Sequence, residues 1–501
     1  MLAALPIAVI LLLMMGLRWS AARAGSVGLA VALLLAWTEY GLGTQRMPEL
    51  GAAGAAGGAM AEALFLAATI LWIIFPALCI HELQMKKGGM DILKQAMERV
   101  AGDARILALL VAWFFVLFVE GAAGFGTPMA LAAPFLVGAG FSRVAAVSMA
   151  LVGHAVGVAF GAVGTPIIPQ VAASSLGAQE LAAANANYHV LLSWTLPLVV
   201  MWLASRAMPG GPGKPLWGWA ALAAICFFLP YYLLARFVGP ELPTLAGALL
   251  GALLFIAALR WMRKPEMSPH AVAPGSAVLL RAASPYLVLI ALVVLTRLVP
   301  PVQDALRAVS LSWSYASFSG SMQVLYHPGT LLMLSFLLGA CLQQASFREI
   351  LHAAASVCRK LFPVLLALIA MLGLSRIMVH AGMIDALALA AAEAAGRSWP
   401  LFAPLIGILG SFVTGSATAS NILFGGFQVA TAQQLGFSVL GMMASQGYGA
   451  TIGNIVSPHN IVAASATVQL VGREGEVLRQ TAGIALAYAV LGGLLAWLVF
   501  A

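Results

Sequence analysis

The stretch FVEGAAGFGTP, residues 118–128, interrupts an apolar segment with glycine, an acid, a hydroxyl and proline. Residues 412–421, FVTGSATASN, carry the same pattern much later in the chain. A second glycine-rich interruption follows each stretch, GHAVGVAFGAVGTP at 153–166 and SQGYGATIGNIVSP at 445–458. Paired, glycine-broken hydrophobic segments in corresponding halves are the best sequence indication of a secondary transporter's binding site. The pattern predicts two hairpin tips that meet at membrane depth around a small solute.

The two copies align residue by residue without large gaps. The aligned pairs are Glu120 with Thr414, Gly121 with Gly415, His154 with Gln446, Gly157 with Gly449, Gly161 with Gly453, Thr165 with Ser457, and Pro166 with Pro458. Irregular backbone at membrane depth is tolerated only where protein or a wet cavity covers it. The segments around 121–128 and 415–421 are therefore expected to be re-entrant tips that face each other.

Composition places the chain in a membrane. Of the 501 residues, 62% are hydrophobic and only 8% are charged, far from the balance of soluble domains. Many windows are long enough to cross about 30 Å of hydrocarbon as helices, and the alternating period of a membrane barrel is not found. The net charge of +8 comes from basic residues scattered among loops, which indicates membrane orientation rather than nucleic-acid binding. The 4 cysteines are isolated and indicate neither a disulfide framework nor a metal site.

The predicted fold class is an all-α polytopic membrane protein with two inverted-topology repeats and paired broken-helix hairpins, as in elevator-type ion transporters. The elevator step is an analogy. The expected helices cover 2–17, 25–42, 62–82, 90–102, 105–140, 143–166, 189–207, 217–238, 242–260, 283–300, 329–343, 361–379, 383–396, 399–434, 437–458 and 481–500. Of these, 90–102 and 383–396 are expected to be short helices that lie along the membrane surface.

Orientation follows from short basic loops, which favour the cytoplasmic side. The loops assigned to that side hold Arg18 and Arg23, Lys86 to Arg105, Arg260 with Arg263 and Lys264, and Arg348 with Arg359 and Lys360. One threading satisfies all four loops: it places the N-terminus, 43–60 and 301–328 outside. In this threading 62–82 runs inward and 361–379 runs outward, so the two halves have opposite topology.

The expected division is into two repeats joined by a linker. Repeat 1 is 1–207, with scaffold helices in 1–82, an arm helix at 90–102, a hairpin and broken helix at 105–170, and a helix at 189–207. The linker helix pair lies in 208–282. Repeat 2 is 283–501, with scaffold helices in 283–379, an arm helix at 383–396, a hairpin and broken helix at 399–460, and a helix at 481–500.

The tips offer hydroxyls, amides and freed backbone N–H groups, and helices that begin after each break direct positive dipole ends inward. Such a site suits a small carboxylate that carries a further hydroxyl. The candidate substrate-binding residues are Gly124, Gly126, Thr127, Thr165, Thr414, Ser416, Thr418, Ser420, Asn421, Gln446, Asn454 and His459.

Glu120 is the only ionisable side chain within the two tips. Acids at membrane depth are costly and commonly serve proton relay, so Glu120 is the candidate proton carrier, with His154 as a second proton-coupling candidate. Two alternatives stay open: Glu120 pairs with Arg143 or His154 as a structural tie, or His154 is a satisfied structural histidine. For His459, a turn role and a site role are equally open. A catalytic or zinc cluster lacks the required spacing, so no enzyme, metal or cofactor is expected.

The chain resembles the bacterial lactate permease family, whose members carry lactate, glycolate and related 2-hydroxy monocarboxylates together with protons. The resemblance rests on EGAAGFGTP at 120–128, FGAVGTP at 160–166, GSATASN at 415–421, and most specifically on GNIVSPHNIVAASATVQLVGREGEVLRQT at 453–481. The strong matches cover about a fifth of the chain. Ala417 stands where many members carry asparagine, and SPHN also departs from the family pattern; both changes lie in or beside the expected site.

The resemblance implies a proton-coupled symporter of L-lactate or glycolate in the bacterial cytoplasmic membrane. Its expected partners are the small 2-hydroxy carboxylate and the lipid bilayer, with a homodimer as a further expectation from the wider group and no nucleic acid. The rivals are a sodium-coupled carrier of another small organic anion, an anion channel, and an intramembrane enzyme. Replacing sodium at a constant pH gradient would separate the sodium-coupled carrier from the symporter. A channel would conduct passively, without saturable uptake or counterflow. The intramembrane enzyme is disfavoured because the sequence has no nucleophile or metal-ligand spacing.

Overall fold

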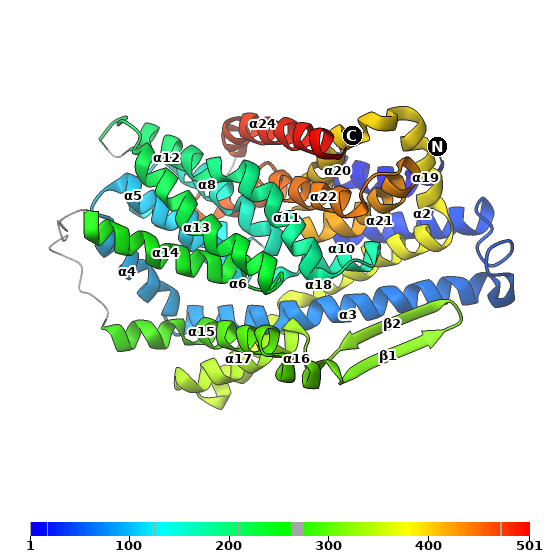
Figure 1. Ribbon diagram of the computed structural model, residues 1–501, viewed down its shortest axis with the longest axis horizontal. Helices are drawn as coiled ribbons and strands as arrows, with labels where there is room; N and C mark the ends of the chain where they lie inside the picture. Colours follow the sequence, from blue (N-terminus) through cyan, green and yellow to red (C-terminus); the bar gives the residue numbers. More distant parts are fainter. Residues whose placement is uncertain are drawn as a thin grey trace.

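The computed structural model describes most of the chain, in the ranges 2–17, 19–124, 126–208, 210–262, 275–470 and 473–500. The orientation predictions for Arg18, Arg263 and Lys264 fall outside these residues. Within the described ranges, ten helical stretches are long and apolar enough to cross a membrane. The structure thus agrees with the predicted polytopic helical class (Figure 1).

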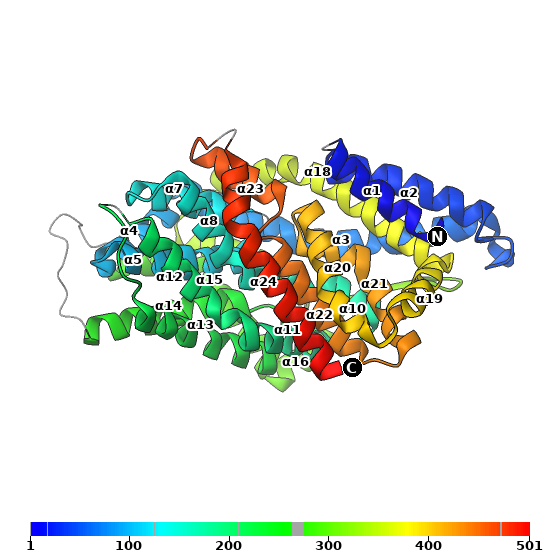
Figure 2. The same cartoon turned by 90° about the horizontal axis from the view of Figure 1, so that it is seen from above.

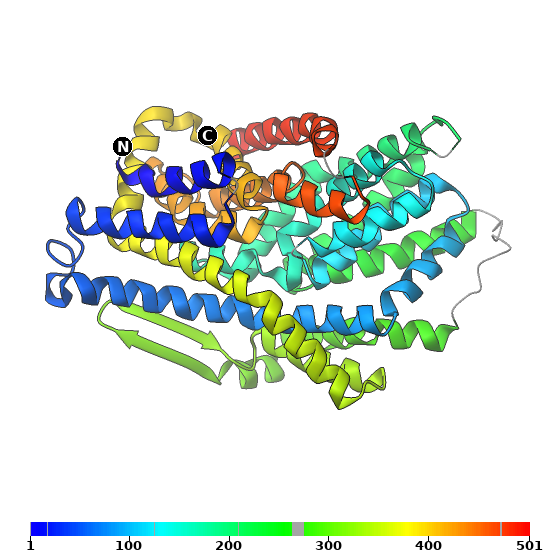
Figure 3. The same cartoon turned by 180° about the vertical axis from the view of Figure 1, so that it is seen from behind.

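One layer of the molecule is built from long helices of both halves, and we call it the α3–α18 layer. In it, α18 packs against α2 and α3, α17 against α3 and α15, and α1 against α2, an arrangement visible from behind (Figure 3). Its helices are α1 (Leu5–Gly16), α2 (Ala21–Thr38), α3 (Gly51–Lys86), α15 (Ser276–Leu298), α17 (Pro328–Leu342) and α18 (Phe347–His380). Small residues let these helices approach closely: a Cβ on Gly25 would lie 3.2 Å from Cβ of Ala370.

The remaining helices form a second group, the central body, which holds both broken-helix regions. Helix α24 crosses this body diagonally when seen from above (Figure 2) and packs on α20 and α22. The first half contributes α5 (Ala104–Leu109), α6 (Val116–Ala122), α7 (Thr127–Gly138), α8 (Arg143–His154), α9 (Gly161–Gly164), α10 (Ile167–Ser174), α11 (Ala178–Leu192), α12 (Leu196–Arg206), α13 (Trp217–Phe237) and α14 (Pro243–Met262). The second half contributes α20 (Trp399–Thr414), α21 (Ala417–Leu435), α22 (Val439–Gly453), α23 (Pro458–Thr467) and α24 (Glu474–Phe500).

Two short helices, α4 (Gly89–Ala101) and α19 (Met383–Ala395), join the layers at matching places in the two halves. Each has 13 residues and follows one of the longest helices of the fold, α3 with 36 residues and α18 with 34. A glycine in the left-handed region makes each turn, Gly88 at φ 68° and Gly382 at φ 71°, a conformation that glycine adopts without steric cost. The predicted helices at 90–102 and 383–396 are therefore found within one residue of their expected ends.

The all-α prediction is wrong in one segment. Residues 301–328, expected as an external loop, contain α16 (Pro300–Arg307) and an antiparallel hairpin of β1 (Ser310–Tyr315) and β2 (Phe318–Gln323), with Leu311 opposite Met322. Phe318 is fully buried, and Trp313 packs edge-on against Phe65 of α3. The alternation of serine with large apolar residues in 310–315 is the strand signal that helix-oriented reasoning missed.

Several predicted helix ends are also wrong. Helix α18 starts at Phe347 rather than 361, because Ser346 and Glu349 form a reciprocal capping box at that point. Polar residues in its first turns interrupt the apolar stretch, so hydropathy alone does not indicate this start. The expected single helix 189–207 is instead two helices, α11 and α12, separated by a short 3-10 turn at Ser193–Thr195.

Helices α13 and α14, expected as a linker pair, pack directly on other helices of the central body. Helix α14 packs on α6, and α13 packs on α11. The Thr244 Oγ1 donates a 2.9 Å hydrogen bond to the Gly157 carbonyl inside the first broken helix. The backbone of Leu245 fills the space beside Gly121, where a Cβ would collide with it. These two helices therefore form a wall of the region that carries the candidate site.

Candidate functional site

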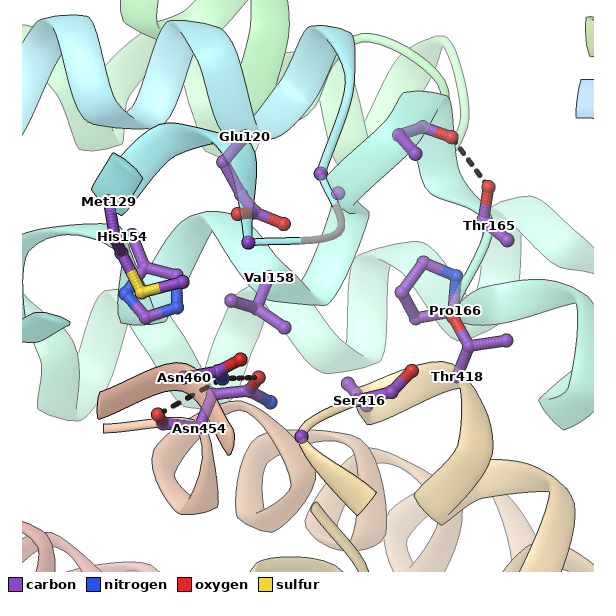
Figure 4. Close-up of a pocket in the computed structure, with 16 residues that line it drawn as sticks. Glu120, Met129, His154, Val158, Thr165, Pro166, Ser416, Thr418, Asn454 and Asn460 are labelled. Atoms are coloured by element: carbon purple, nitrogen blue, oxygen red, sulfur yellow. Dashed lines mark hydrogen bonds between the residues drawn. The ribbon is translucent and has the colours of Figure 1, made fainter. Parts of the chain in front are cut away.

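The two hairpin tips face each other across a small cavity inside the central body (Figure 4). Its volume is about 50 Å³. Both copies of the sequence pattern supply its walls. The described residues that line it are Glu120, Gly124, Gly126, Met129, His154, Val158, Gly161, Ala162, Thr165, Pro166, Gly415, Ser416, Ala417, Thr418, Asn454 and Asn460. Segments far apart in sequence thus meet at one point, as the paired pattern predicted.

Glu120 is in the last turns of α6 and its carboxylate faces the cavity (Figure 4). Its residue is only 5% exposed. No described residue forms a hydrogen bond or ion pair with this carboxyl group, and the predicted alternative partners are engaged elsewhere. Arg143 donates to the Gln469 carbonyl at 3.0 Å, and the His154 Nδ1 lies 2.7 Å from the Leu151 carbonyl. A buried acid without a protein partner is available to a proton or a ligand.

His154 ends α8 and lines the cavity, with its Nδ1 atom bonded to the backbone of its own helix. A carbonyl oxygen only accepts, so Nδ1 must carry the hydrogen that bonds to Leu151. In the neutral ring Nε2 is then an acceptor. His154 can therefore accept a hydrogen bond from a hydroxyl group or receive a proton at this nitrogen.

The backbone at the first break is strained. Ala162 and Val163 have φ values of 41° and 56°, in the left-handed region that non-glycine residues, and β-branched ones above all, rarely adopt. Thr165 Oγ1 holds the turn by donating to the Ala162 carbonyl at 2.6 Å. A Cβ on Gly161 would collide with the Glu120 carboxylate. Strained backbone persists where the surroundings over-determine it, commonly at ligand sites.

The first tip turns through Gly124 and Gly126, at φ 58° and 79°. The Thr127 Oγ1 donates to the Gly124 carbonyl at 2.8 Å, so this hydroxyl closes the turn. The two glycines line the cavity, whereas Thr127 does not. Helix α7 starts immediately afterwards and directs its N-terminal end toward this region.

The second tip is organised by hydroxyl side chains. Ser416 caps α21 by accepting from the Ala419 N–H at 3.3 Å, and it also lines the cavity together with Thr418. Thr414 is used differently: its Oγ1 donates to the Gly410 carbonyl at 2.8 Å and accepts from the Ser416 N–H at 3.2 Å. Thr414 therefore stabilises the turn and is not among the lining residues.

Four further predicted site residues lie behind or beside the cavity wall. Gln446 Nε2 donates to the Ser420 Oγ at 3.1 Å, and its Oε1 accepts from Gln428 at 3.1 Å. Asn421 Nδ2 donates to the Pro166 carbonyl at 2.9 Å, which ties the second tip to the first break. His459 is exposed and packs beside Gly415. The bonds of Gln446, Ser420 and Asn421 join neighbouring helices, and none of the four residues is among those that line the cavity.

The structure adds residues that the sequence reasoning missed. Asn460 donates to the Asn454 Oδ1 at 2.8 Å, and both amides line the cavity. The predicted turn at SPHN is instead the start of α23, and Asn460 lies in the first turn of that helix. Its place directly after the aligned break was the available signal. Met129 and Val158 supply apolar wall (Figure 4), and nothing in their local sequence distinguishes them from packing residues. The predicted residues that do line the cavity are Glu120, Gly124, Gly126, His154, Thr165, Ser416, Thr418 and Asn454.

No three His, Cys, Asp or Glu side chains of the described ranges come together as a metal site requires. The remaining chemistry of the cavity is that of hydroxyls, amides, one carboxyl group and one imidazole. Such groups bind and release a small polar solute and a proton. The described wall has no cysteine or lysine nucleophile.

Comparison with known proteins identifies the group to which this arrangement belongs. The model of the L-lactate permease family matches residues 1–322 and 310–501. The chain belongs to this family. It is therefore a transporter rather than an enzyme, and a multi-pass protein of the bacterial inner membrane.

Individual relatives match over almost the whole chain. The L-lactate permease of Bacillus subtilis is 29% identical, over 93% of this chain and 89% of the relative. The L-lactate permease of Escherichia coli K12 is 30% identical, over 85% and 83%. The glycolate permease GlcA of the same strain is 27% identical, over 96% and 91%. Among solved structures, the Alcanivorax borkumensis YdaH transporter aligns with a TM-score of 0.48 at 15% identity, over 87% of this chain and 85% of that one.

Proposed function

We propose that this protein is a proton-coupled symporter of L-lactate or a close 2-hydroxy monocarboxylate such as glycolate. The observation that carries the proposal is Glu120, a buried carboxyl group without a described partner, on the wall of a small cavity between the two tips. The names of the relatives, L-lactate permease and glycolate permease, support the same substrate class.

The size of the cavity favours a short substrate. A water molecule needs about 10–15 Å³ of such space, so about 50 Å³ accommodates roughly four water-sized groups. A carboxylate with one hydroxyl and one or two further carbons is near this limit. Larger acids require the cavity to widen.

The anion is held without a lysine or arginine in the described wall. Ser416 and Thr418 supply hydroxyl donors, and Asn454 and Asn460 supply amide donors. The N-terminal ends of α7 and α21 add positive dipole. The 2-hydroxyl group can donate to Nε2 of His154, which distinguishes a 2-hydroxy acid from a plain one.

The coupling of lactate to a proton follows from the negative charges of lactate and of ionised Glu120. A lactate anion beside an ionised Glu120 would place two like charges in a site with little water, which is unfavourable. Binding of the anion is therefore favoured when Glu120 carries a proton, and both leave together on the other side. His154 lies on the same wall (Figure 4) and is the candidate for passing the proton.

Alternating access requires the central body to move against the α3–α18 layer. The helices α4 and α19, each entered through a left-handed glycine, are the candidate connections. Their matched positions after α3 and α18 extend the similarity of the two halves beyond the broken segments.

The test is uptake of radiolabelled L-lactate into proteoliposomes with an alkaline interior and no sodium. Symport requires saturable accumulation that a protonophore abolishes. A sodium gradient without a pH gradient is the second arm: accumulation in that arm alone would replace the proton by sodium. Passive flux that neither saturates nor shows counterflow would mean a channel.

A further inference from the structure

A second cavity, of about 500 Å³, lies away from the site described above. It lies between the end of α3, the start of α4, the start of α15 and the end of α17. The described residues that line it are Gln84, Lys87, Gly89, Ile92, Ala277, Val278, Arg281, Ala282 and Gln343. Its four walls come from the end of the molecule that the basic loops assign to the cytoplasm.

Two cations face this cavity. The Nζ of Lys87 forms an ion pair with the Oε1 of Glu349 at 2.9 Å. Arg281 is exposed, and its guanidinium has no hydrogen bond or ion pair to a described residue. Of the described lining residues, two are basic and none is acidic, so the cavity favours an anionic group. A guanidinium fork matches the oxygens of a phosphate particularly well.

Two buried glutamine side chains at the cavity, Gln84 and Gln343, need hydrogen-bond donors rather than an anion. The Gln84 Nε2 donates to the Ala282 carbonyl at 2.6 Å, and the Gln343 Nε2 donates to the Arg281 carbonyl at 3.2 Å. These bonds fix which end of each amide is nitrogen, because a carbonyl only accepts. The remaining oxygens, Oε1 of both glutamines, are buried and have no partner. Such acceptors are costly unless a ligand or water donates to them.

The surface beside the cavity is apolar. Val278 and Leu280, in the first turns of α15, are 47% and 61% exposed. In a membrane protein this exposed surface contacts acyl chains. A ligand for this cavity therefore combines a phosphate, hydrogen-bond donors and apolar tails.

We propose that the cavity binds the headgroup of a membrane phospholipid that carries donors beyond its phosphate, as ethanolamine or glycerol headgroups do. The phosphate lies against Arg281 and Lys87, the ammonium or hydroxyl donors satisfy the two glutamine oxygens, and the acyl chains follow α15. A choline headgroup has no N–H or O–H donor and fits poorly. Basic pockets between helices near the cytoplasmic side are a recurrent lipid-binding arrangement.

The test uses the purified, delipidated full-length protein and native mass spectrometry. Phosphatidylethanolamine, phosphatidylglycerol and phosphatidylcholine are added separately at equal concentration. Arg281→Ala removes the free cation, and Ala277→Trp fills the cavity from an exposed position. The matched controls are Arg348→Ala and Ser276→Trp, both exposed at the same end of the molecule and outside the lining.

We expect one ethanolamine or glycerol lipid to be retained by the wild type and by both controls. Occupancy should fall about tenfold in Arg281→Ala, in Ala277→Trp, and with the choline lipid. Equal retention by wild type and Arg281→Ala overturns the proposal, and so does equal retention of all three lipids. If millimolar inorganic phosphate displaces the lipid and raises the melting temperature as much, the site is a phosphate site and the lipid assignment is wrong.

Discussion

The two hairpin tips share a sequence pattern, yet aligned side chains of the two copies differ in whether they line the cavity. The first tip presents Glu120 to the cavity, whereas its aligned residue Thr414 is bonded within its own turn. Likewise, His154 lines the cavity, whereas Gln446 is bonded to Ser420 and Gln428 inside the central body. The titratable groups thus come from one copy, and the second tip contributes hydroxyls.

The two breaks also differ, in their backbone conformation. The first contains two non-glycine residues in the left-handed region, Ala162 and Val163. The second turns through Asn454 and Ser457 without a positive φ. Two copies of one sequence pattern can therefore differ both in the side chains that they present and in the backbone strain that they hold.

The largest effect is expected from moving the acid between the copies. Glu120→Gln should abolish pH-driven accumulation of lactate in proteoliposomes while exchange of labelled lactate continues, because the amide cannot take up the proton. Adding Thr414→Glu should not restore accumulation, since position 414 lies within the turn. Glu180→Gln, at an exposed acid of α11, is the control. Restored accumulation in the double variant would show that the two positions are interchangeable.

A smaller effect is expected from Gly161→Ala in the first break. The added Cβ would collide with the Glu120 carboxylate, so lactate uptake should fall about tenfold, the equivalent of about 1.4 kcal/mol of binding. Gly426→Ala in α21 is the control, because its Cβ would make only an ordinary 3.7 Å contact with Val379. Wild-type uptake by the Gly161 variant would mean that the carboxylate does not need its present position.

His154→Gln makes the first copy resemble the second. We expect the half-saturating lactate concentration to rise roughly three- to tenfold, as loss of one hydrogen bond implies, and pH-driven accumulation through Glu120 to become slower because the amide cannot pass a proton. Propionate, which lacks the 2-hydroxyl group, should be affected less than lactate in competition assays. Loss of accumulation with unchanged affinity would instead make His154 an obligatory proton carrier.

The smallest effect is expected from the cap of the second tip. Ser416→Ala removes the side-chain acceptor for the Ala419 N–H and should cost about 1 kcal/mol of unfolding free energy. The first tip starts α7 at Gly126 without a side-chain cap, so Gly126→Ser offers no equivalent gain and strains a backbone at φ 79°. Thermal unfolding in detergent measures both. A stabilised Gly126 variant would contradict the difference between the tips.

Sequence reasoning recovered the helical class, the two breaks and the pair of short helices at 90–102 and 383–396. Hydropathy and the positions of glycines are local properties of the sequence, so they can be interpreted without knowledge of the fold. The hairpin at 310–323 and the early start of α18 were missed. Both depend on features shorter than a membrane-spanning window: an alternation over six residues and the Ser346–Glu349 cap.

The lining of the cavity was predicted less evenly. Glu120, Gly124 and Gly126 were expected near a solute because an ionisable residue and broken backbone at membrane depth are unusual in themselves, and all three line the cavity. Thr414, Ser420, Asn421 and Gln446 carry the same residue types as the lining residues, and only their bonds within the body distinguish them. Asn460 was missed because its neighbour His459 was chosen instead. In the structure His459 is exposed and Asn460 lines the cavity, and local sequence does not show which of two successive residues points inward.

The sequence by itself determined the membrane environment, the positions of the two paired glycine-rich breaks and the single acid within the two tips, because hydrophobicity, spacing and ionisable chemistry are properties of the residues. Only the tertiary structure decided which polar side chains face the solute. Successive residues of a helix point in different directions, and a hydroxyl or amide bonds to whichever partner the packing brings near. The cavity exists because four broken segments from distant parts of the chain meet, and that meeting is decided by packing rather than by any single stretch of sequence.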